Sequence, residues 1–317
     1  MRLRPLVALS AVALSALLLA GCSGGGDPSP EASTTGAGAD LCASAAPSGA
    51  VSDGVTATGD VGSVPTVDFS KPLSADGLTL QRTVTVEGTG AALKAGDFVD
   101  YAATILDGTT GDVLSQSGYQ PGQLLPQQVS AQSGGSIFGC ATIGSRIAIA
   151  TATGDEKMPT VVYVVDVLGV TPTAAWGEPQ QPEAGMPTVT LDDSGAPSIT
   201  VPADLADPAT TEVSVLKKGD GPVVQSGDSV LVQYKGVLKD GTEFDSSWKK
   251  GTPVSFTTTG VVAGFQKALE GQTVGSQVLA VIPAAEGYGD KEQGAIPANS
   301  TLVFVVDILA VAPNAAQ

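Results

Sequence analysis

Few side chains in this sequence could act as nucleophiles, bases or metal ligands. The 317 residues include no histidine, which removes the commonest general base and the commonest metal ligand. The three cysteines, Cys22, Cys42 and Cys140, form no Cys-x-x-Cys pair. The acidic pair Asp192-Asp193 lacks the spacing of a calcium loop, and no glycine-rich segment matches a phosphate-binding loop. We therefore expect no cofactor and no metal.

The aromatic side chains are the other candidates, and they make up only 4% of the chain. Tyr288 lies between Gly287 and Gly289, and a loop tyrosine flanked by glycines has no obvious packing role. Its hydroxyl could donate a hydrogen bond to a ligand. A phenylalanine within a strand is more often a core residue, so Phe244, Phe256 or Phe304 taken alone would indicate packing.

The first 22 residues predict an export signal. Arg2 and Arg4 precede an apolar run over residues 6–20 that is short for a membrane span. The run ends in Leu19-Ala20-Gly21-Cys22, which resembles the bacterial lipobox, where the chain is cut before the cysteine and the cysteine is acylated. We expect a lipoprotein anchored through Cys22 to the outer side of the cell membrane. An ordinary signal peptide or an uncleaved anchor is the alternative.

The two remaining cysteines allow one pairing. An extracytoplasmic compartment permits disulfides, and with Cys22 acylated only Cys42 and Cys140 are left. We predict a Cys42–Cys140 disulfide, with two buried thiols as the alternative.

The charge of the chain excludes one class of partner. Its 15 Lys and Arg residues stand against 32 Asp and Glu residues, which gives a formal net charge of −17. Phosphate backbones need basic partners, so we expect no nucleic-acid binding. Solubility is the simplest interpretation of the acidity.

Two copies of one pattern follow each other along the chain. Gly96-Asp97 and Gly227-Asp228 are 131 residues apart, and each pair follows a Gly-x-Gly turn. Val-Val-Asp recurs at 164–166 and 305–307, an offset of 141, so the second copy carries ten extra residues. Pro-Thr-Val at 65–67 and 187–189 marks the start of each copy. We expect a signal peptide at 1–21, a flexible tether at 22–54, a first domain at 55–172, a linker at 173–184, and a second domain at 185–317 with its core at 211–313.

Short strands dominate the second copy. β-branched and alternating runs predict strands at 211–217, 229–238, 277–282 and 301–311. Residues 265–270 are helix-like and end at Gly271. The pattern predicts an α+β fold in which an antiparallel sheet of five or six twisted strands is wrapped on a short helix, once in each domain.

The second copy, over residues 211–313, resembles the FKBP family of peptidyl-prolyl cis-trans isomerases. The motifs that carry the resemblance occur in family order, and they are Val232-Gln233-Tyr234-Lys235-Gly236, Asp240-Gly241-Thr242-Glu243-Phe244-Asp245-Ser246-Ser247, Gly264-Phe265, Val281-Ile282-Pro283, Gly287-Tyr288-Gly289 and Ile296-Pro297. Lys249-Lys250, which follows the second motif, is expected to be a solvated turn.

The resemblance implies an apolar pocket for a proline ring. Phe265 would be its floor, where many family members have tryptophan, and Tyr288 would donate its hydroxyl to a substrate carbonyl from a loop facing the same cavity. Val261 and Val262 would lie just before the helix, with a backbone N–H available to a substrate carbonyl. The complete set that the resemblance implies is Tyr234, Phe244, Asp245, Phe256, Val261, Val262, Phe265, Tyr288, Ile296 and Phe304.

Such a pocket needs no cofactor. An X-Pro bond rotates over a barrier of about 18–20 kcal/mol without any bond being broken. An apolar pocket disfavours the planar, polar ground state relative to the twisted transition state. The resemblance therefore implies a prolyl isomerase, or rotamase, acting on proline-containing polypeptides during extracytoplasmic folding, with immunosuppressant macrolides as further ligands. A non-catalytic chaperone or peptide-binding adaptor is the alternative.

The first copy lacks the residues that the resemblance assigns to the pocket. At the offset of 131, Ala103 stands in place of Tyr234 and Gly134 in place of Phe265. The ten missing residues remove the loop that carries Tyr288. We expect the first domain to share the fold without the activity.

Overall fold

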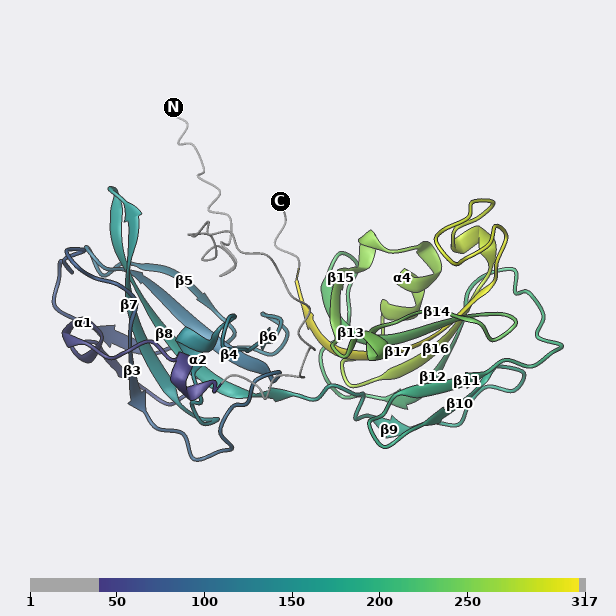
Figure 1. Ribbon diagram of the computed structural model, residues 1–317, viewed down its shortest axis with the longest axis horizontal. Helices are drawn as coiled ribbons and strands as arrows, with labels where there is room; N and C mark the ends of the chain where they lie inside the picture. Colours follow the sequence, from purple (N-terminus) through teal and green to yellow (C-terminus); the bar gives the residue numbers. More distant parts are fainter. Residues whose placement is uncertain (1–39, 314–317) are drawn as a thin grey trace, which may run out of the picture.

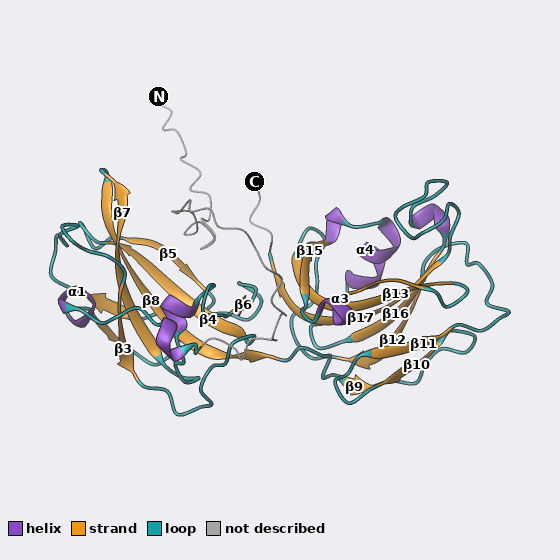
Figure 2. Cartoon of the chain, in the orientation of Figure 1, coloured by secondary structure: helices purple, strands orange, loops and turns teal. Residues whose placement is uncertain are grey.

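The structure, a computed structural model, describes residues 40–313, and Cys22 lies outside this range. The described chain folds around two sheets, one in each half (Figure 1). Strands dominate both halves, and the helices are short (Figure 2). None of the helices within residues 40–313 has the length and hydropathy to cross a membrane.

The sheet of the second half is antiparallel. Its strands run in the order β14-β13-β17-β16-β12-β9, and β15 pairs with β13. β17 is buried along its whole length, as its β-branched sequence favours. The four strands expected from the sequence are each observed within one residue of their predicted ends. The strands are β9 (Glu178–Pro179), β12 (Glu212–Lys218), β13 (Ser229–Leu238), β14 (Glu243–Ser246), β15 (Val254–Thr257), β16 (Gln277–Ile282) and β17 (Leu302–Ala312).

A short helix, α4 (Ala263–Leu269), packs on one face of this sheet. Its Ala268 and Leu269 are completely buried in the main core of the second half. Gly264 permits the close approach, because a Cβ there would lie 2.3 Å from the Ile282 side chain of β16. A single helical turn, α3 (Ser247–Lys250), follows β14.

The sheet of the first half has the same topology. Its order is β5-β4-β8-β7-β3 with β6 paired to β4, which matches β14-β13-β17-β16-β12 with β15 paired to β13. A one-turn helix, α2 (Gly135–Phe138), takes the place of α4. The strands are β3 (Gln81–Val86), β4 (Phe98–Asp107), β5 (Val113–Ser117), β6 (Gln127–Gln128), β7 (Arg146–Asp155) and β8 (Met158–Thr171).

The sequence repeat corresponds to repeated hydrogen bonds. The Gly88 N–H donates to Ser145 Oγ at 2.9 Å, and the Gly219 N–H donates to Ser276 Oγ at 2.9 Å. The ten extra residues lie between β16 and β17, where β7 and β8 are instead joined by a tight turn at Asp155–Met158. The second half therefore has a long loop over residues 283–301 that the first half lacks.

The opposite face of each sheet is covered by a hairpin that the sequence did not predict. β1 (Thr56–Thr58) pairs with β2 (Thr66–Asp68), and β10 (Thr188–Leu191) pairs with β11 (Pro197–Thr200). Val189 and Ile199 of the second hairpin pack on a separate core beneath β16 and β17. Pro-Thr-Val leads into β2, the second strand of the first hairpin, but into β10, the first strand of the second hairpin. The motif therefore does not mark equivalent positions in the two copies.

Two boundaries differ from the sequence expectation. The tether expected over 22–54 does not include residues 41–54, because Leu41 is buried in the core of the first half and α1 (Ala50–Asp53) packs near β3. In the expected linker at 173–184, Ala175 is buried and β9 pairs with β12. These residues therefore form the edge of the second sheet rather than a free connection.

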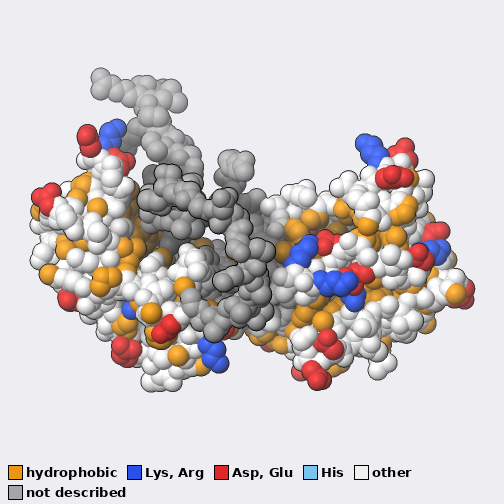
Figure 3. Space-filling model, viewed as in Figure 1, with side chains coloured by type: hydrophobic (Ala, Val, Ile, Leu, Met, Phe, Trp, Pro, Cys, Tyr) orange, Lys and Arg blue, Asp and Glu red, His pale blue; other side chains and the backbone are white. Residues whose placement is uncertain are grey.

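Charged side chains are dispersed over the surface. On the face shown in Figure 3, basic side chains are few and most lie beside acidic ones, without a continuous basic patch. This distribution agrees with the exposed ion pairs, such as Lys239–Asp207 at 2.9 Å.

Candidate active site

Five aromatic rings meet between α4 and the sheet of the second half. Phe265 lies among them, with its ring centroid 5.0 Å from that of Phe304, 5.9 Å from that of Phe256 and 6.2 Å from that of Tyr234. Phe244 lies 5.3 Å from Phe304. All four of these pairs are edge-to-face, a favoured arrangement for aromatic rings. We call these five residues the aromatic cluster.

Each ring of the aromatic cluster comes from a different element. Tyr234 comes from β13, Phe304 from β17 and Phe265 from α4, and these three are buried. Phe244 on β14 and Phe256 on β15 are only partly buried. The buried rings form an apolar floor, and Phe244 and Phe256 form its partly exposed edge.

Three aliphatic residues expected at the site lie in the same core. Val261 and Val262 are partly buried against it, and Ile296 from the long loop is 6% exposed. The Val262 carbonyl accepts the N–H of Phe265 at 2.9 Å, which starts α4. Among residues 40–313 no acceptor is found for the Val262 N–H, so this amide is free for a ligand.

The polar rim of the aromatic cluster consists of three side chains. The Tyr234 hydroxyl donates a hydrogen bond to Asp245 Oδ2, and Lys250 Nζ lies 2.6 Å from Asp245 Oδ1. The same ammonium lies 5.8 Å from the centroid of the Tyr234 ring. A cation at this distance from a ring face adds electrostatic attraction. Asp245 and Lys250 therefore fix the orientation of Tyr234.

The rim keeps both of its acidic groups in one protonation state near neutral pH. Burial, and then the hydrogen bond to Asp245, raise the pKa of Tyr234 to about 12. Burial alone would raise the pKa of Asp245, but hydrogen bonds from Lys250 and Tyr234 together lower it. Tyr234 is a neutral donor and Asp245 a charged acceptor across the physiological range.

Lys249 and Lys250 are exposed, as expected of a solvated turn, but each of them also pairs with a carboxylate of β14. The single turn of α3 ends at Gly251, whose φ of 80° suits glycine, and this turn brings Lys250 back toward Asp245. Lys249 pairs with Glu243 at 2.7 Å. The spacing of five residues between Asp245 and Lys250 was a usable signal, because a strand followed by one helical turn reverses the chain.

A buried network, also missed from the sequence, holds the segment that carries Asp245. Ser247 Oγ accepts the N–H of Tyr234 at 2.8 Å and donates to the side-chain oxygen of Gln233. Ser247 is completely buried and Gln233 is 3% exposed. Their hydrogen bonds fix β14 and α3 against β13.

Tyr288 lies in the long loop and is 38% exposed. Glu286 anchors this loop, because it pairs with Lys267 at 2.5 Å and accepts the N–H of Thr211 at 3.0 Å. Within the described residues Tyr288 stacks on no ring of the aromatic cluster, and its hydroxyl has no hydrogen-bond partner. A cavity shared by Tyr288 and Phe265 therefore stays a prediction.

The first half fills the corresponding place with its own chain. Ala103 replaces Tyr234, and Leu41 is buried in the same core as Ala103 and Phe138. Cys42, next to Leu41, forms a disulfide with Cys140 beyond α2, with an S–S distance of 2.06 Å. This is the pairing that the sequence predicts. The segment before the first sheet thus packs into the core of the first half beside α2.

Comparisons with known proteins match the second half. A family model described as FKBP-type peptidyl-prolyl cis-trans isomerase matches residues 221–309. The FK506-binding protein of Streptomyces anulatus is 41% identical over 115 residues, which are 35% of this chain and 88% of that protein. FK506-binding protein 1 of Debaryomyces hansenii is 41% identical over 108 residues, 33% of this chain and 96% of that protein.

Other relatives are longer than the matched part. The FKBP-type peptidyl-prolyl cis-trans isomerase FkpA of Escherichia coli K12 is 42% identical over 99 residues, 31% of this chain, and the match spans only 37% of that protein. The crystal structure of FkpA from Escherichia coli superposes with a TM-score of 0.33 at 35% identity, covering 41% of this chain and 53% of that chain.

Proposed function

Because the chain belongs to the family of FKBP-type peptidyl-prolyl cis-trans isomerases, we propose that its second half catalyses the cis–trans rotation of X-Pro bonds in polypeptides that fold outside the cytoplasm. The observation that supports this most directly is the aromatic cluster with its neutral Tyr234 and charged Asp245.

The rotation breaks no covalent bond, so the main contribution of the protein is the environment around the X-Pro amide. The uncatalysed rotation takes tens to hundreds of seconds because the planar amide is stabilised by resonance. The planar state is polar, whereas the twisted state has lost resonance and carries less charge on the carbonyl oxygen. A dry apolar floor formed by Phe265 and Phe304 raises the energy of the planar state relative to the twisted one.

The remaining residues of the site orient the peptide. We expect the N–H of Val262 and the hydroxyl of Tyr288, neither of which has a hydrogen-bond partner among residues 40–313, to donate to substrate carbonyls. We expect a substrate proline ring to be surrounded by Phe244, Phe256, Val261 and Ile296, while Asp245 holds Tyr234 in place.

A proline-limited refolding assay tests this proposal. The full chain should accelerate refolding of a protein whose slow phase is a cis-proline, and Phe265→Leu should lower the acceleration about tenfold, equivalent to about 1.4 kcal/mol. Val113→Ser is the control, because Val113 is 53% exposed on β5 of the first half. An unaccelerated slow phase with well-folded wild-type protein would favour the non-catalytic peptide-binding adaptor instead.

The same pocket is proposed to bind FK506-type macrolides. Two relatives that match over most of their length carry the name FK506-binding protein. We expect FK506 to inhibit the refolding activity and Phe265→Leu to weaken the inhibition. If saturating FK506 did not inhibit the refolding activity, the macrolide proposal would be wrong and only polypeptides would remain as ligands of the pocket.

The proposed location at the outer side of the cell membrane is supported by the sequence and by one structural feature. Residues 1–21 and Cys22 predict lipid anchoring, and the Cys42–Cys140 disulfide suits an oxidising compartment. Incorporation of labelled palmitate should be lost in Cys22→Ser. Equal labelling of the wild type and this variant would refute the anchor.

A further inference from the structure

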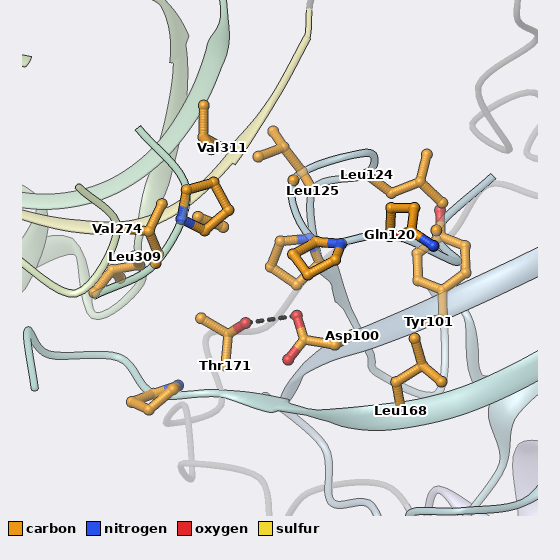
Figure 4. A pocket seen from close by; sticks show the side chains of 18 of the residues that line it. Asp100, Tyr101, Gln120, Leu124, Leu125, Leu168, Thr171, Val274, Leu309 and Val311 are labelled. Atoms are coloured by element: carbon orange, nitrogen blue, oxygen red, sulfur yellow. Dashed lines mark hydrogen bonds between the residues drawn. The ribbon is translucent and has the colours of Figure 1, made fainter. Parts of the chain in front are cut away.

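A cavity of about 380 Å³ lies between the two halves, away from the aromatic cluster. The first half contributes Tyr101, Leu124 and Leu168 to its wall, and the second half contributes Val274, Leu309 and Val311 (Figure 4). Prolines 121, 126, 172 and 222 also line it. Its volume lies in the range of known ligand sites, and its lining is mostly apolar.

Buried contacts between the halves keep this cavity open. Phe98 and Leu125 of the first half form one buried cluster with Leu231, Leu309 and Ala310 of the second half. Leu125, Leu309 and Ala310 also line the cavity, so the packing that joins the halves continues into its wall. The cavity is therefore preformed and needs no closing motion to exist.

A single charged group lines the cavity. Asp100 on β4 is the only Asp, Glu, Lys or Arg among the lining residues that the structure describes. Its Oδ1 accepts the hydroxyl of Thr171 at 2.7 Å (Figure 4), and no donor to its Oδ2 is found within residues 40–313. Burial raises the pKa of Asp100 against the smaller, lowering effect of Thr171. An acid held in apolar surroundings gains from a cationic partner.

The negative charge of Asp100 and of the whole chain narrows the kinds of molecule that could bind in this cavity. A second copy of this chain would bring another net charge of −17, and an anionic lipid surface or a nucleic acid would add more negative charge. A polypeptide segment with one Lys or Arg among apolar residues matches both the walls and the acid. Trp176, which lines the cavity and is 43% exposed, offers such a segment an aromatic surface.

We propose that the cavity between the halves is a second polypeptide-binding site, which takes an apolar segment of an unfolded client with its Lys or Arg side chain paired to Asp100. This site lies beyond the proposed isomerase pocket and does not depend on it for binding.

β17 connects the two sites. Phe304 belongs to the aromatic cluster and Val311 to the cavity, seven residues further along the same strand, which is about 23 Å. An extended client needs about seven residues to cover this distance. A client anchored in the cavity would hold its nearby prolines at a raised local concentration around the isomerase site.

Two labelled peptides without proline test the binding. One has the sequence Gly-Leu-Val-Arg-Leu-Val-Gly, and the other has Glu in place of Arg. Fluorescence anisotropy with the full chain should show the Arg peptide binding at least about tenfold more tightly, the gain expected from one charge-assisted contact. Asp100→Asn should bring the ratio of the two affinities close to one.

Leu124→Ser is the second variant, because it removes apolar surface from the wall that the first half contributes without touching the Asp100–Thr171 hydrogen bond. It should weaken both peptides, whereas Val113→Ser, on the exposed face of β5, should weaken neither. Phe265→Leu should leave both affinities unchanged, which separates this site from the isomerase pocket.

Three results would overturn the proposal. The first is an affinity ratio that Asp100→Asn does not change in a folded protein. The second is displacement of the Arg peptide by a proline peptide, together with its loss in Phe265→Leu, because the peptide would then occupy the isomerase pocket. The third is a dimer in sedimentation that Leu124→Ser dissociates, because a second copy of the chain would then occupy the cavity.

Discussion

The ammonium of Lys250 lies 2.6 Å from the Asp245 carboxylate that accepts the hydroxyl of Tyr234, so a cation at the rim controls the acceptor that orients a ring of the floor. Tyr234 in turn lies 6.2 Å from both Phe265 and Phe304. An exposed turn is thereby connected to the apolar floor through two side chains.

Lys250 should contribute modestly to turnover. Lys250→Met removes the cation, and because both partners are partly exposed the pair is worth about 0.2–1 kcal/mol. We expect kcat/KM for a proline peptide to fall about two- to fivefold, with nearly unchanged Tm. Lys250→Arg should restore most of the activity. A loss in Lys250→Arg as large as in Lys250→Met would show that the charge is not what matters.

The pH dependence of the site follows from the same contacts. The pKa of Asp245 is below its ordinary value, so its stabilising contribution is complete above the unfolded pKa and is lost as pH falls through the folded one. With the pKa of Tyr234 near 12, turnover should be constant from pH 5 to 9. Lys250→Met should move the acidic limb of the profile to higher pH. A profile that bends near neutral pH in the wild type would contradict this assignment.

Phe265 and Tyr288 should differ in importance. Phe265→Ala removes a buried ring, which costs about 3–5 kcal/mol of unfolding free energy, and it opens the floor of the site. Tyr288→Phe removes one exposed hydroxyl and should weaken turnover only modestly. The comparison uses a proline-peptide assay at a temperature where both variants are folded, with Phe265→Leu as the milder floor variant. Equal losses in Phe265→Leu and Tyr288→Phe would refute the ranking.

Local patterns predicted the strands, because alternation and β-branching determine which side chains share a face, whereas the floor of the site was expected only from the family resemblance. β13 is an example, since its alternation places Val230, Val232 and Tyr234 in one core. The glycines around Tyr288 correctly predicted a loop but said nothing about what the ring contacts. A loop position is set by anchors such as Glu286, which binds residues far away in the sequence.

Polar contacts between residues far apart in the chain could not be predicted from the sequence. The repeated Val-Val-Asp was visible, but the role of its aspartate was not. Asp166 accepts the N–H of Gly62 at 2.7 Å, and Asp307 accepts the N–H of Ala175 at 2.8 Å. In each half the buried acid ties the preceding segment to the sheet across more than a hundred residues, and no local period records such a pair.

The anchor of the Tyr288 loop should depend on pH. Hydrogen bonds from Lys267 first, and then from Thr211, lower the pKa of Glu286 to about 2. A depressed pKa means that the stabilisation is present above the unfolded pKa near 4.5 and is lost as pH falls toward 2. Glu286→Gln should therefore lower Tm at pH 7 and raise KM, and the difference in Tm should shrink between pH 4.5 and 2. A constant difference in Tm would mean that the side chain acts through packing.

The disulfide of the first half should stabilise the protein without affecting catalysis. Cys42 and Cys140 are 98 residues apart, and closing a loop of this size typically contributes about 2–5 kcal/mol. The double variant Cys42→Ser/Cys140→Ser should unfold at lower urea concentration, in a transition that releases Leu41 from the first core. Its activity on a proline peptide should equal that of the wild type, because all ten site residues lie in the second half. Dithiothreitol should shift the wild-type unfolding midpoint to that of the variant and leave the variant unchanged. A parallel loss of activity in both would show instead that the first half supports the isomerase site through the contacts between the halves.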